Sequence, residues 1–399
     1  MSELTKITDS IYDEIVAIRR DIHAHPELGM QEVRTSALIR DELKKMGMDE
    51  ITSPLPTGVV GVLHGKKGSG KCVAMRADID ALPVTEETGL PFSSENPGVM
   101  HACGHDFHAA MLLGVAKVMC KMRDSFAGSI KFIFQPSEDT MPGGSRQMVA
   151  AGCMENPHVD AIYGIHVNPS PVENLGRINL YKGYTSTAVD LFDIDIEGKS
   201  GHGSAPHTAN DAIVAAGLLI TALQQIVSRR VNPLETAVLT IGTMSGGEAV
   251  NIVAGHAKIN AVSRYYGDDV RQTVLEQVNK ICQGIGIACG CEITPHLTEG
   301  YAATYNDPHL VDLAEAAITE ELGAEYCPYL DSPFSGSEDF SFYSRLTGVP
   351  GAFFFVEAGY NGELVSLHNG KCSPMEGVIK PAVSGMSRVL LKCLEDLNK

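Results

Sequence analysis

The stretch Met100-His-Ala-Cys-Gly-His-Asp-Phe-His108 gathers three histidines, a cysteine and an aspartate ahead of an apolar run. Neutral imidazole and cysteine thiolate bind borderline and soft divalent metals, and Gly104 allows Cys103 and His105 to converge on one point. The alternative is a loop whose histidines only cap the following helix. The stretch alone leaves both interpretations open, and the rest of the chain decides between them.

Strands and helices alternate on both sides of this stretch. We expect strands at residues 59–64, 72–79, 129–134, 161–167 and 352–356, and helices at 1–20, 36–46, 109–122, 309–321 and 381–397. Gly47 is a plausible C-cap for the second of these helices. The alternation predicts an α/β domain with a mixed, largely parallel sheet.

The loop Gly65-Lys-Lys-Gly-Ser-Gly-Lys71 nearly spells a phosphate-binding P-loop. However, Cys72 replaces the hydroxyl residue that ends that motif, and the next segment is strand-like where a P-loop requires a helix. We therefore expect a hairpin turn between the strands at 59–64 and 72–79.

The pattern changes after Lys182. Strands are expected at 189–197, 237–244, 257–265 and 291–297, and helices at 210–229 and 268–288. This βαββαβ order is typical of a ferredoxin-like unit that can fold as an insertion. The predicted domains are therefore 1–182 with 299–399, and 183–298 between them.

Composition limits the classes of function. A chain of 399 residues predicts two domains, and a net charge of -18 argues against nucleic acid and anionic membrane surfaces as partners. The N-terminal segment lacks the pattern of a signal peptide, and the apolar runs at 109–120 and 212–222 fall short of the roughly 20 residues that span a bilayer. The ten cysteines are then expected to be reduced thiols, and the cytoplasm is the expected compartment.

Several possible metal ligands are expected in loops or at strand ends of the first domain. They are Cys103, His105, the Glu138-Asp139 pair, His166 and His368. Each alone has an ordinary alternative: a single histidine is often only hydrogen-bonded, and adjacent acids often form a solvated turn. Together they are enough for a two-metal centre with one carboxylate left for proton transfer.

The order of five motifs makes the chain resemble a known family. They are Arg76-Ala-Asp-Ile-Asp-Ala-Leu-Pro83, His101-Ala-Cys-Gly-His-Asp106, Phe134-Gln-Pro-Ser-Glu-Asp139, Gly164-Ile-His-Val167 and Gly201-His-Gly-Ser-Ala-Pro-His207. In this order they resemble the aminoacylase and carboxypeptidase-type metallo-amidohydrolases (peptidase family M20). Within that family the chain looks most like the auxin-conjugate, hippurate and N-acetyldiaminopimelate hydrolases. The resemblance extends from His23 to the C-terminal helix.

The resemblance implies roles for individual residues. The implied ligands of two divalent metal ions are Cys103, as the bridge, with His105, Asp139, His166 and His368. Glu138 is implied as the general base, and Asp80 as the carboxylate that orients a ligand histidine. In the inserted domain, His202 is implied to bind the reacting carbonyl, often across a dimer interface, and Asn251 and Arg264 to bind a substrate carboxylate.

Two departures from the family pattern concern the ligands. Asp139 stands where relatives generally have glutamate, so its carboxylate is one methylene shorter. His368-Asn-Gly-Lys-Cys372 replaces the usual His-Ser-Pro, which makes His368 the least secure ligand. Thiolate and imidazole suit zinc, the family also accepts manganese, and nickel or cobalt are further alternatives.

The sequence thus predicts a hydrolase with two metal ions per subunit that cleaves the amide bond of N-acyl amino acids or similar small conjugates. The inserted domain is predicted to serve as a lid and to form a homodimer. A dipeptidase or aminopeptidase, and a metal-binding protein without turnover, are the alternatives. Closure is expected at hinges near 182–183 and 299–300, the two expected crossings between the domains.

Overall fold

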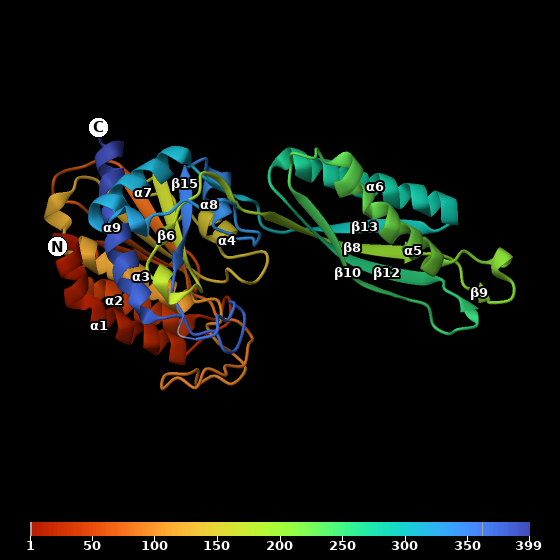
Figure 1. Ribbon diagram of the computed structural model, residues 1–399, viewed down its shortest axis with the longest axis horizontal. Helices are drawn as coiled ribbons and strands as arrows, with labels where there is room; N and C mark the ends of the chain where they lie inside the picture. Colours follow the sequence, from red (N-terminus) through yellow and green to blue (C-terminus); the bar gives the residue numbers. More distant parts are fainter. Residues whose placement is uncertain (1, 361) are drawn as a thin grey trace. The chain divides into compact units, whose positions relative to one another are not determined.

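The chain folds into two compact units (Figure 1). The structure is a computed structural model that describes residues 2–360 and 362–399. Unit 1 comprises Met1–Thr185, Thr304–Pro333 and Asp339–Lys399, and unit 2 comprises Ser186–Ala303 and Phe334–Glu338. The chain therefore crosses between the units four times instead of the expected two, because residues 334–338 group with unit 2.

Unit 1 is built on a seven-stranded mixed sheet in the order β1-β2-β4-β3-β5-β15-β6. Its strands are β1 (Glu50–Thr52), β2 (Val59–His64), β3 (Cys72–Asp78), β4 (Ser129–Gln135), β5 (Ala161–Asn168), β6 (Ile178–Asn179) and β15 (Gly351–Glu357). Strands β4, β3, β5 and β15 run parallel to one another, whereas the outer pairings are antiparallel. The predicted mixed, largely parallel sheet is confirmed.

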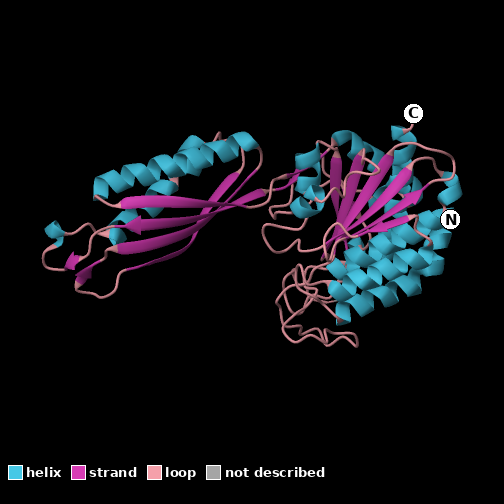
Figure 2. Ribbon diagram, turned by 180° about the vertical axis from the view of Figure 1, so that it is seen from behind, coloured by secondary structure: helices cyan, strands magenta, loops and turns pink. Residues whose placement is uncertain are grey.

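Helices cover both faces of this sheet (Figure 2). The helices of unit 1 are α1 (Glu3–Ala24), α2 (Val33–Met46), α3 (His105–Lys121), α4 (Ser145–Ala150), α7 (Pro308–Glu321), α8 (Ser341–Thr347) and α9 (Ile379–Leu397). One face packs against α1, α3 and α9, and the other against α4 and α8. Burial on both faces explains why the central strands are buried along nearly their whole length and mostly apolar, rather than alternating between apolar and polar residues.

The expected hairpin between β2 and β3 is wrong, because β4 lies between these two strands. The loop that follows β2 bonds instead to the segment leading into β4: the Gly65 N–H donates to the Gly128 carbonyl at 2.8 Å, and the Gly128 N–H donates to the Gly68 carbonyl at 3.0 Å. Turn residues show that the chain bends there, but strand order depends on distant pairing, which local turn chemistry does not encode.

Helix α3 begins at His105, four residues before the predicted start. Gly104 precedes it in the left-handed conformation, with a φ of 85°. A Cβ at Gly104 would lie 2.3 Å from Cγ2 of Val167, so only glycine fits against strand β5 here. His105 is consequently held by the first turn of a helix rather than by a loop.

Unit 2 is a four-stranded antiparallel sheet in the order β10-β12-β8-β13, with two helices packed against it. Its main elements are β8 (Ala188–Glu197), α5 (Ala212–Leu223), β10 (Ala237–Gly246), β12 (His256–Tyr265), α6 (Asp268–Cys289) and β13 (Glu292–Glu299). The short strands β9 (Gly201–His202) and β11 (Ile252–Val253) pair with each other, and β7 (Gly183–Ser186) pairs with β14 (Thr304–Asn306) where the chain passes between the units. The element order and strand order are those expected of a ferredoxin-like unit.

Helix α5 and the turn that follows it (Ile226–Arg230) form a 19-residue apolar helix from Ala212 to Arg230. In the part of the chain that the structure describes, this is the one helix whose length and composition would allow it to cross a membrane. The run is thus longer than the segment 212–222 considered above. One side of the helix, including Ala215 and Leu219, is buried against the sheet of unit 2, while Ile213, Val214 and Leu218 are exposed.

Candidate metal centre

The predicted ligands of unit 1 converge where its parallel strands end. Asp80 follows β3, Glu138 and Asp139 follow β4, and His166 lies near the end of β5. The carboxyl ends of parallel strands meet at one edge of a sheet, where ligand sites of α/β proteins form. Cys103 and His105 reach the same place from the start of helix α3.

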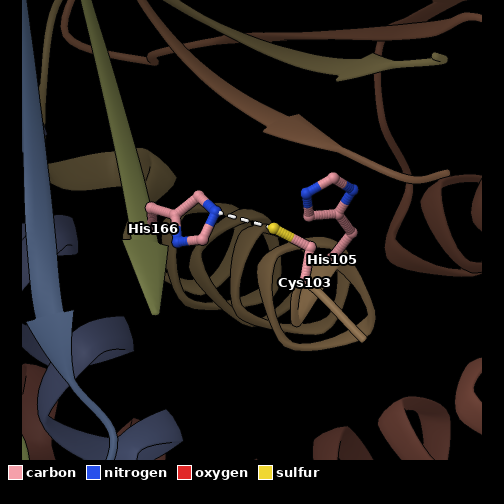
Figure 3. A group of neighbouring side chains, drawn as sticks. All are labelled: Cys103, His105 and His166. Carbon is pink, nitrogen blue, oxygen red and sulfur yellow. Dashed lines mark hydrogen bonds between the residues drawn. The ribbon is translucent and has the colours of Figure 1, made fainter. Parts of the chain in front are cut away.

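A first group of possible ligands consists of Cys103, His105 and His166, whose ligand atoms all lie within 4.8 Å of one another. Figure 3 shows the sulfur of Cys103 between the two imidazole rings. Sγ of Cys103 lies 3.4 Å from Nε2 of His166, while Nδ1 of His166 lies 2.7 Å from the Val167 carbonyl. That carbonyl fixes the proton on Nδ1, so Nε2 has its lone pair free to bind a metal.

A second group shares the same sulfur and consists of Cys103, Asp139 and His368. Nε2 of His368 lies 3.2 Å from Sγ of Cys103 and 3.4 Å from Oδ1 of Asp139. The His368 N–H donates to the Ala102 carbonyl at 2.8 Å, which anchors this loop beside Cys103. The two groups together bring all five predicted ligands into one place, and Cys103 is common to both.

Asp80 contacts one residue from each group. Its Oδ1 lies 3.1 Å from Nδ1 of His105, and its Oδ2 accepts the backbone N–H of Asp139 at 3.0 Å. Asp80 is buried, which alone would raise its pKa, but the hydrogen bond from His105 and the charge of His105 lower the pKa below its ordinary value. An ionised Asp80 holds one proton of His105 on Nδ1. Although burial acts in the opposite direction, the charge of Asp78 raises the pKa of His105 well above its ordinary value, so Nε2 has to lose its own proton when a metal ion binds.

The chemistry of the donor set fits divalent metal ions. Nε2 of His105 and Oδ2 of Asp139 are buried, lie 3.8 Å apart and have no hydrogen-bond partner among the described residues. Buried polar atoms rarely lack a partner. The missing partner of these two atoms is therefore expected to accept an electron pair from each of them, as a metal ion does. One sulfur, three imidazoles and one carboxylate are suitable ligands for zinc-like ions.

Burial determines the protonation states of the cysteine and of one histidine. It raises the pKa of the Cys103 thiol well above its ordinary value, and the charge of Asp139 adds to the shift. It lowers the pKa of His166 well below its ordinary value, with the charge of His108 acting in the same direction. His166 is therefore a neutral imidazole, and Cys103 has to lose a proton when a metal ion binds.

Glu138 lies beside the two groups without belonging to either of those that contain Cys103. Its residue is 4% exposed, and its Oε2 lies 3.9 Å from Nε2 of His105. A carboxylate that stands next to a metal site without being needed as a ligand has the position required of a general base.

A buried network behind the ligands was not predicted. Arg76 on β3 contacts Asp78 and Asp339, each at 2.7 Å, and Gln135 at 2.8 Å. Asp78 in turn lies 2.5 Å from Nδ1 of His108, whose Nε2 accepts the Val167 N–H at 2.8 Å. The sequence showed the motif that begins at Arg76 and charge inside an apolar strand, where Arg76 and Asp78 alternate with buried alanine and methionine, but neither signal points to Asp339 or His108.

The three predicted site residues of unit 2 do not lie together. His202 pairs with Ile252, and the Gly203 N–H donates to the Asn251 carbonyl at 2.8 Å, so His202 and Asn251 are neighbours near the start of β12. Arg264 is at the other end of β12, well along the strand from His256 and paired with Val189. At about 3.3 Å per residue, His256 and Arg264 are roughly 26 Å apart along this strand.

His202 and Arg264 differ in their surroundings. The His202 side chain is exposed, and its Nδ1 accepts the Ser204 N–H at 3.2 Å and lies 2.8 Å from the Ser204 hydroxyl. Its Nε2 then carries the proton and can donate it. Arg264 donates to the Ser337 hydroxyl at 2.8 Å.

This fold and these ligand groups define a metal-dependent hydrolase that acts on amide bonds. The chain belongs to peptidase family M20/M25/M40, whose model matches residues 74–392. It is 41% identical to an N-acyl-L-amino acid amidohydrolase of Geobacillus stearothermophilus over 76% of this chain and 81% of that protein. It is 37% identical to a hippurate hydrolase of Campylobacter jejuni over 99% of this chain and 100% of that protein.

A solved structure agrees with the sequence relatives. A dinuclear metal-binding peptidase of the M20 family from Bacillus subtilis superposes with a TM-score of 0.83 at 31% identity, over 97% of this chain and 99% of that one. Its two metals and the two ligand groups around Cys103 together support two metal ions in this protein. The predicted family, fold class and class of enzyme are confirmed.

Proposed function

We propose that this protein hydrolyses the amide bond of N-acyl amino acids or similar small conjugates with two divalent metal ions. The observation that carries the proposal is the shared sulfur of Cys103, which links two ligand groups beside the carboxylate of Glu138. The names of the relatives, an N-acyl-L-amino acid amidohydrolase and a hippurate hydrolase, support the same substrate class.

The ligands proposed for the two ions are the five residues of the two groups. His105 and His166 would hold one ion and Asp139 and His368 the other, and the sulfur of Cys103, which is common to both groups, would be available to both ions. When bound, the ions lower the pKa of the attacking water and polarise the scissile carbonyl. The thiolate and three imidazoles favour zinc over manganese.

Glu138 is proposed as the group that moves the proton. It accepts a proton from the attacking water and returns it to the nitrogen of the scissile amide. This protonation makes the amine a good leaving group. Asp80 is proposed as the residue that orients His105, through the contact at 3.1 Å. The rest of the chain then has to bind the carbonyl oxygen and the substrate carboxylate.

Binding of the carbonyl oxygen and of the substrate carboxylate is proposed for unit 2. The protonated Nε2 of His202 suits donation to the carbonyl oxygen, and Asn251 beside it together with the guanidinium of Arg264 suits a carboxylate. Because strand β12 runs roughly 26 Å from His256, close to Asn251 in sequence, to Arg264, we infer that a small substrate does not touch both Asn251 and Arg264 of the same subunit. A homodimer, in which His202 and Asn251 serve the partner's site, resolves this conflict.

The surface of unit 2 supports such a dimer. Apolar side chains are exposed along helix α5 and around strand β10, which is an open edge of its sheet. They include Ile213, Val214, Leu218, Val238, Met244, Val250 and Ile252. Exposed apolar patches of this kind mark association sites. The roles of unit 1 as catalytic domain and unit 2 as lid and dimerisation domain are part of the proposal, as is a cytoplasmic location.

A panel of substrates tests the function. Metal-loaded protein is incubated with N-acetyl and N-benzoyl amino acids and with dipeptides that carry a free amine, and release of the product amine is measured. Hydrolysis of the acyl substrates alone supports the proposal. Hydrolysis of dipeptides alone would indicate the dipeptidase or aminopeptidase alternative, and no turnover with metals bound would indicate a metal-binding protein.

A further inference from the structure

Ser137, the residue before Glu138, has an unusual backbone conformation. Its φ is 55°, in the left-handed region that side chains with a Cβ rarely adopt. Holding a serine in this conformation costs free energy, so contacts from the surrounding structure must stabilise it. Residues strained in this way cluster at functional sites. Three neighbours from other parts of the chain contact this position.

The first neighbour is Glu32, a buried carboxyl group at the start of helix α2. Its Oε1 accepts the Ser137 N–H at 2.9 Å. Glu32 is the N-cap of α2, yet its side chain makes no capping hydrogen bond. Glu27 caps that helix instead, accepting the N–H groups of Arg34 and Thr35 at 2.9 and 2.8 Å. The carboxyl group of Glu32 is therefore turned away from its own helix and toward Ser137.

Two glycines approach the same segment closely. A Cβ at Gly29 would lie 2.6 Å from Oγ of Ser137, and one at Gly144 would lie 1.8 Å from the Pro136 carbonyl oxygen. The Gly144 N–H also donates to the Ser137 carbonyl at 2.8 Å. Ser137 is thus packed on one side by the loop that leads to Glu32 and on the other by the loop that leads to α4.

The residues after Ser137 are held by a second carboxylate. The N–H of Asp139 donates to Oδ2 of Asp80 at 3.0 Å, so the amides on both sides of Glu138 are each fixed by a buried acid. Burial of a carboxyl group is costly unless it is hydrogen-bonded. In agreement with that cost, burial raises the pKa of Glu32 to about 7.

We propose that Glu32 is a positioning residue that clamps Ser137 in the left-handed conformation and thereby aims Glu138 and Asp139 into the metal centre. The proposal rests on the function proposed above for Glu138 and Asp139. Glu32 is not itself among the proposed metal ligands, and it acts only through the backbone of Ser137.

Metal affinity and a second substitution at Ser137 test the clamp. Glu32→Ala removes the acceptor, so titration calorimetry of zinc into the metal-free protein should show about tenfold weaker binding at the weaker site, the loss typical of a residue that orients a ligand. Glu32→Gln keeps an acceptor oxygen and should bind zinc like the parent. Glu27→Ala is the matched control: it weakens the start of the same helix without contacting Ser137, and zinc affinity should stay unchanged.

Ser137→Gly separates a clamp from a general structural role. Glycine adopts a positive φ without strain, so Glu32→Ala should cost about threefold or less when it is combined with Ser137→Gly. Gly29→Ala would place a methyl group against Ser137. It should also weaken zinc binding, and this loss should likewise be smaller when it is combined with Ser137→Gly. An equal loss with and without Ser137→Gly, or no loss from Glu32→Ala, would overturn the clamp. Zinc affinity is measured without substrate, so a failure of the proposed hydrolase activity alone would leave this result intact.

Discussion

Asp80 accepts the backbone N–H of Asp139 at 3.0 Å with one carboxylate oxygen, while its other oxygen lies 3.1 Å from the ring of His105. One side chain thus orients a residue from each of the two ligand groups. Any change at Asp80 should therefore affect both halves of the centre at once.

We expect Asp80→Asn to lower metal affinity by about 10- to 100-fold, the usual effect of losing a group that orients a ligand. The amide can face only one of its two donors with an oxygen, so either Asp139 loses its partner or the His105 ring keeps only the Asp80 backbone carbonyl at 2.9 Å. Calorimetric titration of the metal-free protein measures the loss at each site. A change confined to activity, with both affinities retained, would contradict this role for Asp80.

Cys103→Ser should lower occupancy at both metal sites, because the two ligand groups share this sulfur. Metal analysis after dialysis measures the occupancy. In the parent protein a thiol reagent should modify Cys103 more slowly when metals are bound. Cys120→Ser, near the end of the helix that follows Cys103, is the control and should keep its metals. Retention of one full equivalent by Cys103→Ser would show that the sulfur is not shared.

Much of the fold follows from local patterns, and much of the site follows from motifs. Apolar runs identify the strands of both units, and the βαββαβ order identifies the ferredoxin-like unit. The position of β4 between β2 and β3 is not predictable in this way, because it depends on pairing between distant segments. The salt bridge between Arg76 and Asp339 joins residues far apart in sequence, so the motif that contains Arg76 does not reveal its partner.

The separation of Asn251 and Arg264 was also not predictable from motifs. Both were assigned to a substrate carboxylate by resemblance, but Asn251 lies beside Gly203, before the start of strand β12, whereas Arg264 lies near the end of that strand. The conflict disappears only if two chains build each site, which makes subunit exchange the natural test.

His202→Ala and Glu138→Gln proteins should each be nearly inactive, yet a mixture that exchanges subunits should recover activity. In a mixed dimer one site receives an intact Glu138 from one chain and an intact His202 from the other. After complete exchange at equal amounts, about a quarter of the parent activity is expected, since half the dimers are mixed and each has one intact site. Verified mixed dimers without activity would show that His202 serves its own subunit.

Glu86 should contribute acid-sensitive stability. Burial alone would raise its pKa, but hydrogen bonds from His23, Thr88 and the Ser94 N–H lower the pKa to about 2. A carboxyl group whose pKa is lowered by folding stabilises the protein above its unfolded pKa of about 4.5, and this contribution is lost as the pH falls toward 2.

We expect Glu86→Gln to lower the free energy of unfolding at neutral pH and to flatten its decline between about pH 4.5 and 2. Chemical denaturation at several pH values measures both effects. Glu87→Gln changes the exposed neighbouring residue and should follow the parent curve. Parallel curves for the parent and Glu86→Gln would rule out this contribution.

The most direct test of the whole account is a metal titration followed by two signals, binding and hydrolysis of an N-acyl amino acid. Metal-free parent protein should bind two equivalents per chain and become active as they bind. Glu138→Gln should bind the same two equivalents and hydrolyse the substrate about 100- to 10,000-fold more slowly, because only the proton carrier is lost. Binding of a single equivalent by the parent, or near-normal turnover by fully loaded Glu138→Gln, would contradict a two-metal amide hydrolase with Glu138 as its base.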